Sequence, residues 1–270
     1  MQRHISLFLF CALSQNTFAA DTQPDFHWPK NIQAAVSLAY DDALDSQLDV
    51  AIPALNKYKL KGSFYLTLSS PTIARRLPEW RAAAAQGHEL GNHTLFHQCS
   101  RSLPNREWVS PKNDLDKITV EQLKDQILIA NTMLHTIDGK HERTFTTPCA
   151  DLNAGGENYI DSVKSEFVAI KAAAGNGIAP AMNTLDPYAV NVIAPSNVTG
   201  QQLIEIVKQA ASKGTMANFT FHGVNGDYLQ ISKEAHEALL QFLAEHRDIY
   251  WTDTFINLMK YVKTQSAQPK

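Results

Sequence analysis

Short apolar runs alternate along most of the chain with segments in which apolar residues recur at helical spacing. The runs typical of buried strands cover residues 35–39, 62–66, 89–91, 143–147, 167–170, 190–193, 218–222 and 249–251. The segments of helical period cover residues 48–60, 77–86, 119–137, 159–166, 201–211 and 233–246. About seven or eight strand–helix pairs predict an α/β fold, in which parallel strands close into a barrel with the helices outside. Because no linker-like stretch interrupts the pattern, we expect a single domain.

The N-terminal residues follow a different pattern. A basic residue precedes a nearly continuous apolar stretch at residues 5–13, and small residues then lead to Ala19 and Ala20. This pattern is typical of a secretory signal peptide that is cleaved after one of these alanines. A membrane anchor is the alternative, but about nine apolar residues fall short of the roughly 20 that span a bilayer. We therefore expect a signal peptide at residues 1–20, a mature domain at residues 21–270, and a secreted or periplasmic protein.

The composition narrows the classes of function. The chain has 270 residues, of which 44% are hydrophobic and 19% charged, and its formal net charge is −3. These values are ordinary for a globular protein, and they exclude collagen-like and disordered classes. Because the chain is slightly acidic and has no cluster of lysine and arginine, we expect no nucleic-acid partner. A chain of this length folds without a metal or a disulfide, so a metal site would serve chemistry.

Residues with catalytic potential follow three of the predicted strands. Asp41 and Asp42 are adjacent carboxylates, which repel each other unless a cation or a shared proton lies between them. A pair of helix N-cap residues is the alternative. His93 and His97 would share one face of a helical turn, from which both imidazoles can reach one ion. His222 closes another strand, where a hydrogen-bonded structural histidine is the alternative.

The barrel topology predicts that these residues meet. In a parallel barrel, the loops that follow the carboxyl ends of the strands converge on one face, and active sites form there. We therefore expect one site to contain Asp41, Asp42, His93, His97 and His222. Two histidines and one carboxylate leave coordination positions open, which indicates a catalytic ion and not a structural one.

Three motifs in this order carry a family resemblance. They are Tyr40-Asp41-Asp42, Gly91-Asn92-His93-Thr94-Leu95-Phe96-His97 and Phe221-His222-Gly223. With them the chain resembles the polysaccharide deacetylases of the NodB-homology, carbohydrate esterase 4 type, over about residues 33–262. The resemblance implies a distorted (β/α) barrel and one divalent ion, usually zinc, with cobalt, nickel or manganese as alternatives. It also implies hydrolysis of acetyl groups on sugars, most often of N-acetyl amides.

The resemblance further implies a role for each residue of the motifs. Asp41 would be the general base that takes a proton from water, and His222 would be the general acid that protonates the leaving amine. The backbone N–H of Cys149 would donate to the oxyanion. The ligands of the ion would be Asp42, His93 and His97.

The chain departs from the family pattern in its third motif, which reads Thr146-Thr147-Pro148-Cys149. The family usually has an arginine at the position of Thr146, where it holds the base aspartate, and an aromatic residue at the position of Cys149. Arg143 lies an odd number of strand positions away, so its side chain should point to the opposite face. A lysine stands at position 171, and residues 186–188 match the fourth motif only loosely.

Three further residues are candidates for contact with the substrate or with His222. Tyr40 precedes the two aspartates, and Trp108 belongs to a long polar segment at residues 100–117 that would form a wall over a sugar. For Trp108, packing in the core is an equally good interpretation. Asp186 is the candidate for a carboxylate that raises the pKa of His222.

Cys99 and Cys149 are the two cysteines of the expected mature chain. Cys99 lies two residues after His97, and Cys149 follows Pro148, so the expected site brings both to one rim. Neighbouring cysteines of an exported protein should oxidise. The disulfide would close a loop of about 50 residues, worth on the order of 4 kcal/mol in the chain-entropy model. Two unrelated buried thiols are the alternative.

The sequence favours an exported, metal-dependent hydrolase that removes acetyl groups, N-acetyl more than O-acetyl, from a carbohydrate polymer or oligomer. Its partner would be an acetylated carbohydrate, and we expect neither a nucleic-acid partner nor a membrane span. Two alternatives stay open. One is a metal-containing carbohydrate-binding protein without turnover, because the third-motif arginine is missing. The other is a hydrolase of a non-sugar amide on the same fold.

Overall fold

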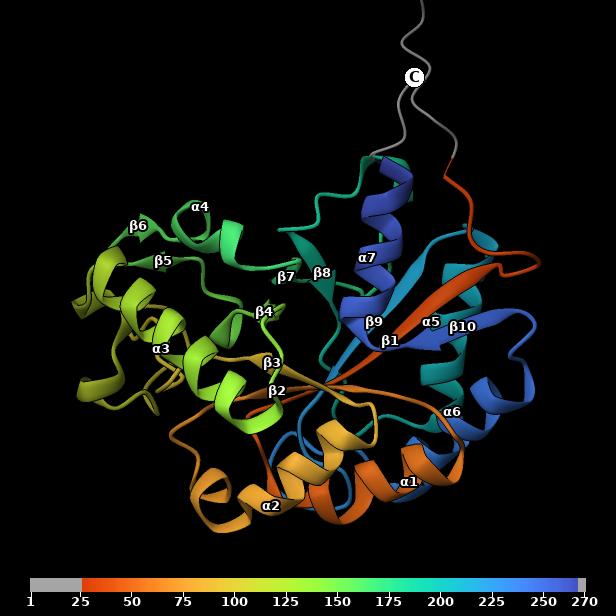
Figure 1. The fold of residues 1–270 in the computed structure, drawn as a ribbon, viewed down its shortest axis with the longest axis horizontal. Helices are drawn as coiled ribbons and strands as arrows, with labels where there is room; N and C mark the ends of the chain where they lie inside the picture. The colour runs from red at the N-terminus through yellow and green to blue at the C-terminus, as the bar shows by residue number, and fades with distance from the viewer. Residues whose placement is uncertain (1–25, 267–270) are drawn as a thin grey trace, which may run out of the picture.

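The computed structural model describes residues 26–266 of the chain (Figure 1). The expected signal peptide, residues 1–20, lies outside the described residues. Among residues 26–266, no helix is both long enough and apolar enough to cross a membrane.

Within the described residues, eight parallel strands form one sheet that curls into a nearly closed barrel (Figure 1). The strands are β1 (Ala34–Asp41), β2 (Ser63–Leu66), β3 (Glu89–Asn92), β4 (Thr144–Thr146), β7 (Ala169–Ala174), β8 (Val190–Val192), β9 (Met216–Phe221) and β10 (Tyr250–Asp253). Their hydrogen-bonded order is β10-β1-β2-β3-β4-β7-β8, and β9 pairs with β1. A parallel bridge between Ile193 and Phe219 joins the end of β8 to β9. The predicted barrel of seven or eight parallel strands is therefore confirmed.

β1 occupies the centre of the sheet. It pairs with β9 along residues 35–40, with β10 along residues 34–37, and with β2 along residues 39–41. All eight residues of β1 are buried, as expected for a parallel strand that is covered on both faces. The carboxyl end of β1 therefore lies between two other strands, where side chains from neighbouring loops can reach it.

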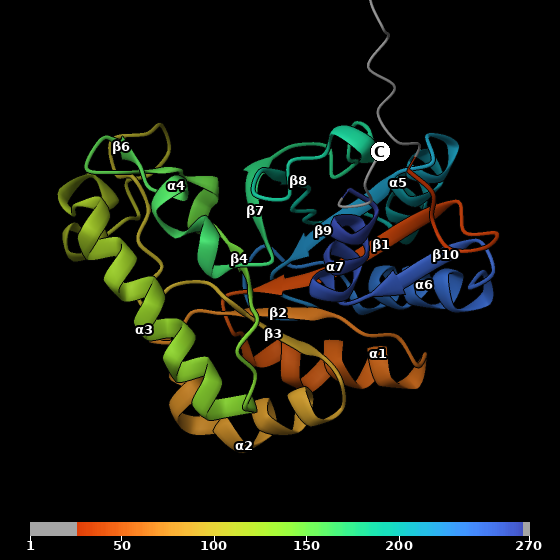
Figure 2. The same cartoon turned by 45° about the horizontal axis from the view of Figure 1, so that its top comes forward.

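The helices lie outside the barrel, as Figure 2 shows from a second direction. They are α1 (Ile52–Lys57), α2 (Pro71–Ala85), α3 (Val120–Asp138), α4 (Ile160–Val163), α5 (Gly200–Ser212), α6 (Lys233–Glu245) and α7 (Phe255–Ser266). Capping boxes with Thr119 and Thr199 begin α3 and α5, and Gly139, with φ of 73°, ends α3. A small antiparallel hairpin of β5 (Asn153–Ala154) and β6 (Glu157–Asn158) follows β4.

Three helices differ from those that the periodicity of the sequence predicts. A π-helical turn at Gln47–Ala51 precedes α1. α2 begins earlier than its apolar spacing indicates, because Pro71 suits the first turn of a helix. It kinks at Arg76, in the turn before Pro78, which has no backbone N–H to donate a helical hydrogen bond. The predicted helix at residues 159–166 is α4 followed by a 3-10 turn at Lys164–Glu166.

The outer face of β1 packs beneath α6. Tyr40 is fully buried there, and its ring stacks on Phe64 with the centroids 4.8 Å apart. The Tyr40 hydroxyl shares a hydrogen bond of 2.7 Å with Nε2 of His236, which is also fully buried. Burial lowers the pKa of His236 to about 3, because the cation would lose its hydration.

This buried histidine predicts acid sensitivity. The folded-state pKa of His236 lies below the unfolded value of about 6.5, so only the unfolded state takes up this proton as the pH falls through that window. As the pH falls, the free energy of unfolding should therefore decrease in both proteins. The decrease should be steeper in the wild type than in His236→Gln, by about 1.4 kcal/mol per pH unit. Urea unfolding between about pH 6 and about pH 5, with a chelator throughout, measures both slopes. The exposed-site variant His141→Gln should keep the wild-type slope; the same slope in His236→Gln would contradict the assignment.

Candidate active site

The carboxyl ends of β1, β3 and β9 open into one cavity of about 930 Å³. β1 ends at Asp41 and is followed by Asp42, β3 is followed by His93 and His97, and β9 is followed by His222. All five predicted residues line the cavity, namely Asp41, Asp42, His93, His97 and His222.

Asp42 lies at the centre of the cluster. Its Oδ1 is 3.2 Å from Nε2 of His93 and 3.1 Å from Nε2 of His97. Its other oxygen, Oδ2, is 3.7 Å from Nε2 of His222. Asp41 contributes a second carboxylate, whose Oδ2 is 3.8 Å from Nε2 of His93. The fold therefore joins residues that are up to 181 positions apart in sequence, since 222 − 41 = 181.

The segment from His93 to His97 is a loop, so the predicted helical turn is wrong. Thr94 and His97 adopt left-handed backbone conformations, with φ of 65° and 49°. Asn92 Oδ1 accepts a hydrogen bond from the Thr94 N–H at 2.8 Å, and Thr94 Oγ1 accepts one from the His97 N–H at 3.0 Å. These side-chain bonds replace helical backbone bonds, and the resulting loop still turns both imidazoles toward Asp42.

The cluster fits a divalent ion. Nδ1 of His93 donates to the carbonyl oxygen of Thr146 at 2.7 Å, so the ring, when it is neutral, presents the lone pair of Nε2 to Asp42. A lone pair and a carboxylate oxygen at this separation repel each other unless a proton or a metal ion lies between them. The ligand atoms of Asp42, His93 and His97 all lie within 4.8 Å of one another. Imidazole nitrogens with a carboxylate oxygen form a donor set that zinc takes in proteins.

The two carboxylates differ in basicity. Burial acts to raise the pKa of Asp42, but the adjacent imidazoles of His93 and His97 hold it well below its usual value. Burial raises the pKa of Asp41, against the opposing charges of His93 and His222. Burial acts to lower the pKa of His93, but the charge of Asp41 and the bond to Asp42 raise it to about 9. Asp42 therefore suits a permanent anionic ligand, whereas Asp41 suits a proton acceptor.

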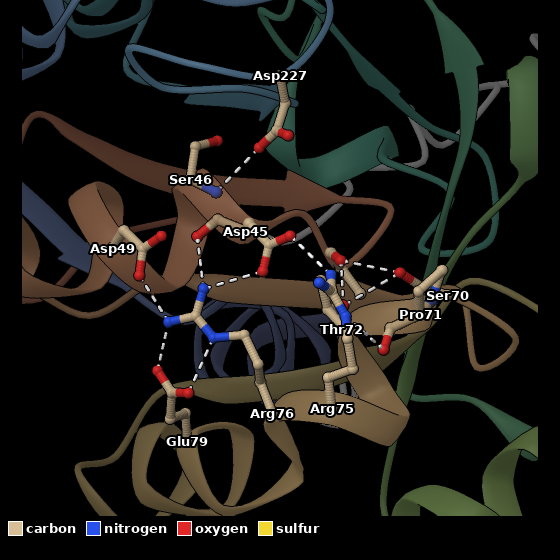
Figure 3. Close-up of polar contacts among 11 residues, drawn as sticks. Asp45, Ser46, Asp49, Ser70, Pro71, Thr72, Arg75, Arg76, Glu79 and Asp227 are labelled. Carbon is tan, nitrogen blue, oxygen red and sulfur yellow. Dashed lines mark hydrogen bonds and ion pairs between the residues drawn. The ribbon is translucent and has the colours of Figure 1, made fainter.

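Buried polar contacts tie the loop after β9 to the loop after β1. Gln47 Nε2 donates to the carbonyl oxygens of Asp41 and His222, at 2.5 and 3.2 Å. The backbone N–H of Ser46 donates to Oδ2 of Asp227 at 2.9 Å (Figure 3). The side chains of the two candidate catalytic residues therefore extend from backbone segments that one amide holds together.

An ion-pair network holds the same loop from its outer side (Figure 3). Arg76, at the kink of α2, binds three carboxylates, those of Asp45, Asp49 and Glu79. The hydroxyls of Ser70 and Thr72 donate to the carbonyl oxygen of Ala43. Exposed ion pairs contribute little individually. Together these contacts fix the loop that follows Asp42. The backbone of Asp42 is itself left-handed, with φ of 81°.

Tyr228 is a site residue to which the sequence analysis assigned no role. Its hydroxyl donates to Oδ2 of Asp42 at 2.8 Å, and its ring centroid is 6.2 Å from that of His222. It lines the cavity from the loop after β9. The sequence could have indicated Tyr228 as a site residue only by its position six residues after His222. Its bond to Asp42 depends on how the loop after β9 folds back over the cavity.

Trp108 and Cys149 lie at the rim of the cavity. Trp108 is 62% exposed, so it is not a core residue, and the Arg106 guanidinium lies 5.8 Å from its ring centroid. Arg106 also donates to the carbonyl oxygen of Cys149 at 3.2 Å. The structure contains the expected Cys99–Cys149 disulfide, with the Cα atoms 5.9 Å apart. Because both sulfurs are in the disulfide, neither is free to compete with the imidazoles for an ion.

Two of the expected substrate contacts lie away from the cavity. Tyr40 points to the opposite face of β1 from Asp41, because successive strand residues alternate, and it is buried beneath α6. Asp186 lies in the exposed turn before β8, where it accepts a hydrogen bond from the Tyr188 N–H at 2.8 Å, and it lines a separate cavity. The carboxylate that lies beside His222 is that of Asp42 instead.

Comparisons with known proteins place this geometry in context. A family model described as polysaccharide deacetylase matches residues 29–166. The solved structure of the peptidoglycan deacetylase PdaC from Bacillus subtilis is similar, with a TM-score of 0.54, 17% identity, and coverage of 87% of this chain and 94% of that chain. The Xyl-CE4 domain of a multidomain xylanase from the hindgut metagenome of Trinervitermes trinervoides gives a TM-score of 0.55 at 14% identity, covering 87% and 93%.

A curated relative has a different description. It is a gellan lyase from a Bacillus species, which is 20% identical to this chain over 87% of the chain. The chain spans about 10% of the length of that relative.

The bond from Tyr228 to Asp42 predicts an effect on metal affinity. Tyr228→Phe removes the hydroxyl and keeps the ring, so the carboxylate loses a partner that orients it. We expect the affinity for zinc to fall by about 10- to 100-fold, measured by competition with a chromophoric chelator. Tyr58→Phe, outside the cavity, is the matched control and should bind zinc like the wild type. Unchanged affinity in Tyr228→Phe would show that its hydroxyl does not orient Asp42.

The disulfide predicts a simple chemical result. Native protein should take up no alkylating reagent at Cys99 or Cys149, and prior reduction should expose both thiols to it. Mass spectrometry of the alkylated protein distinguishes the two states. Reduction should also lower the free energy of unfolding by on the order of 4 kcal/mol. Two alkylated thiols in the unreduced native protein would contradict the bond.

Proposed function

Because the chain belongs to the polysaccharide deacetylase family, we propose that it is an exported, metal-dependent hydrolase of acetylated carbohydrate. It removes acetyl groups, N-acetyl more than O-acetyl, from a polymer or oligomer. The observation that carries the proposal is the cluster of Asp42, His93 and His97, with Asp41 and His222 beside it, around one cavity.

The ion of this proposal is held by Asp42, His93 and His97. We propose zinc, with cobalt, nickel and manganese as alternatives, because the donor set is two imidazoles and one carboxylate. A bound dication supplies Lewis acidity to the acetyl carbonyl and lowers the pKa of water. The bond from His93 to the Thr146 carbonyl fixes the ring for this role.

The side chains of Asp41 and His222 carry out the proton transfers. Asp41 takes a proton from the attacking water, and its Oδ1 is suited to this because it is buried and has no hydrogen-bond partner among the described residues. His222 gives a proton to the nitrogen or oxygen that leaves the acetyl group, and its Nε2 faces the cavity near Asp42. The backbone N–H of Cys149, in a left-handed turn at the rim, is the proposed donor to the oxyanion.

The rim of the cavity supports a carbohydrate substrate. Trp108 and Tyr228 expose 62% and 53% of their surfaces beside the cluster, and aromatic faces of this kind pack on sugar rings. The two similar structures described above are a deacetylase of peptidoglycan and a domain of a xylanase. The disulfide at the rim agrees with an oxidising compartment, and the proposed signal peptide at residues 1–20 would deliver the chain there.

A second candidate function is carbohydrate binding without turnover. The observation that favours it is Thr146, which stands where the family resemblance implies an arginine and whose buried Oγ1 has no hydrogen-bond partner among the described residues. Loss of that cation would leave Asp41 less well held as a base. Both functions need the same ion and the same sugar, so turnover is what distinguishes them.

Acetate release tests the proposal. Zinc-loaded protein is incubated with acetylated chito-oligosaccharide, acetylated xylan and peptidoglycan, and we expect acetate from at least one of them. Asp41→Asn should lower kcat by about 10²- to 10⁴-fold, because a positioned base is lost. The exposed variant Asp161→Asn is the matched control and should keep wild-type kcat.

Each other result has a defined meaning. Sugar binding without acetate release in the wild type would favour the second candidate. Full activity in Asp41→Asn would remove Asp41 as the base. Release confined to a small non-sugar amide would replace carbohydrate as the substrate.

A further inference from the structure

Lys171 is a buried cation that the reaction described above does not use. It lies on β7, is 1% exposed, and lines the same cavity as Asp41. Its Nζ donates to Oγ of Ser37 at 3.0 Å and to the carbonyl oxygen of Phe219 at 3.3 Å. Removal of an ammonium from water is costly, so a lysine in this position needs compensation from an anion as well as from neutral acceptors.

Two carboxylates interact with the charge of Lys171, those of Asp41 and Glu89. Glu89 is fully engaged elsewhere, since it accepts hydrogen bonds from Ser63, Thr144 and Ile256. Asp41 is different, because its Oδ1 is buried without a hydrogen-bond partner among residues 26–266. The imidazoles of His93 and His222 and the carboxylate of Asp42 are the other charged groups that act on Asp41. Lys171 is therefore the cation near Asp41 that is not part of the histidine cluster.

The strand register explains why the lysine stands at this position. Thr146 on β4 is the direct partner of Lys171 on β7 in a parallel pair, so both side chains point to the same face of the sheet. Both line the cavity. The side chain of Thr146 is short and uncharged, which leaves room beside it for the longer lysine. Arg143 is not available for this task, because it forms a buried ion pair of 2.6 Å with Asp138.

We propose that Lys171 is the positioning residue of Asp41 and that it supplies, from β7, the positive charge that Thr146 does not carry on β4. The ammonium attracts the carboxylate toward the barrel interior, so Asp41 meets the substrate water in one orientation. Control of orientation at this scale is worth about 10² in rate. The inference rests on the proposed function, which makes Asp41 the base. The competing role for Lys171 is purely structural, through Ser37 and Phe219.

Turnover gives the first test. Lys171→Met keeps the aliphatic chain and removes the charge, and we expect kcat for acetate release to fall by about 10²-fold with KM and zinc content unchanged. Lys171→Arg should keep most of the activity. Adding Thr146→Arg to Lys171→Met should restore kcat by about tenfold, because it returns a cation to the neighbouring strand position. The exposed lysine variant Lys164→Met is the control and should match the wild type.

The turnover results decide the matter in both directions. Wild-type kcat in Lys171→Met overturns the proposal. An arginine at position 171 that is as inactive as the methionine, or a double variant no better than the single one, also counts against it, because charge would then not be the relevant property. Should Lys171→Met fail to fold, Lys171→Gln, which can still donate to Ser37, takes its place in both experiments.

A double-mutant cycle with Asp41→Asn gives a readout that does not need turnover. The unfolding equilibrium constant is measured in urea, in chelator, for the wild type, both single variants and the double variant. Lys171→Met changes this constant by one factor in the wild type and by another in Asp41→Asn. If Lys171 positions Asp41 through its charge, the two factors should differ about tenfold. Equal factors would mean that Lys171 serves only its neutral partners, which overturns the proposal. A protein that releases no acetate from any substrate would refute the proposed function, whereas the cycle would still decide whether Lys171 holds Asp41.

Discussion

Two adjacent carboxylates buried at the end of β1 are the constraint on which the site depends. Asp41 is 3% exposed and Asp42 is 7% exposed, so neither anion is stabilised by bulk water. Their mutual repulsion and lost hydration must be offset by positive charge close by. The structure places the imidazoles of His93, His97 and His222 around them. A dication between Asp42 and the first two imidazoles would satisfy the same electrostatic requirement.

The barrel makes this concentration of charge mechanically feasible. β1 is paired on both edges by three strands, so its carboxyl end lies deep in the structure and opposite the loops of β3 and β9. Gln47 bonds to the backbone beside both candidate catalytic residues, and Arg76 with its carboxylate partners holds the outside of the same loop. The site is thus built on a rigid frame, and the exposed aromatic side chains at its rim are free to meet a substrate.

The chain has the architecture of its family but differs from the expected family pattern in its third motif. The polysaccharide deacetylase match covers the segment that contains both aspartates, His93 and His97. Within that segment, Thr146 and Cys149 stand at the positions where the family resemblance leads us to expect an arginine and an aromatic residue. Cys149 is joined to Cys99, so a covalent link crosses the rim of the cavity. The charge of Lys171, which lies on β7 beside Thr146 of β4, also acts on Asp41.

The sequence by itself determined the alternation of strands and helices, the parallel barrel, and the five candidate residues at the strand ends, because periodicity and strand-end position are properties of short segments. It also predicted the pairing of the two cysteines, with unpaired thiols as the alternative, and the structure contains the bond. Only the tertiary structure decided that residues 93–97 form a loop, that Tyr40 belongs to the core, and that Asp186 lies in a separate cavity. The same holds for the bond between Tyr228 and Asp42, which are 186 positions apart. Such contacts depend on how loops close and how side chains of different strands pack, and no local pattern of residues encodes them.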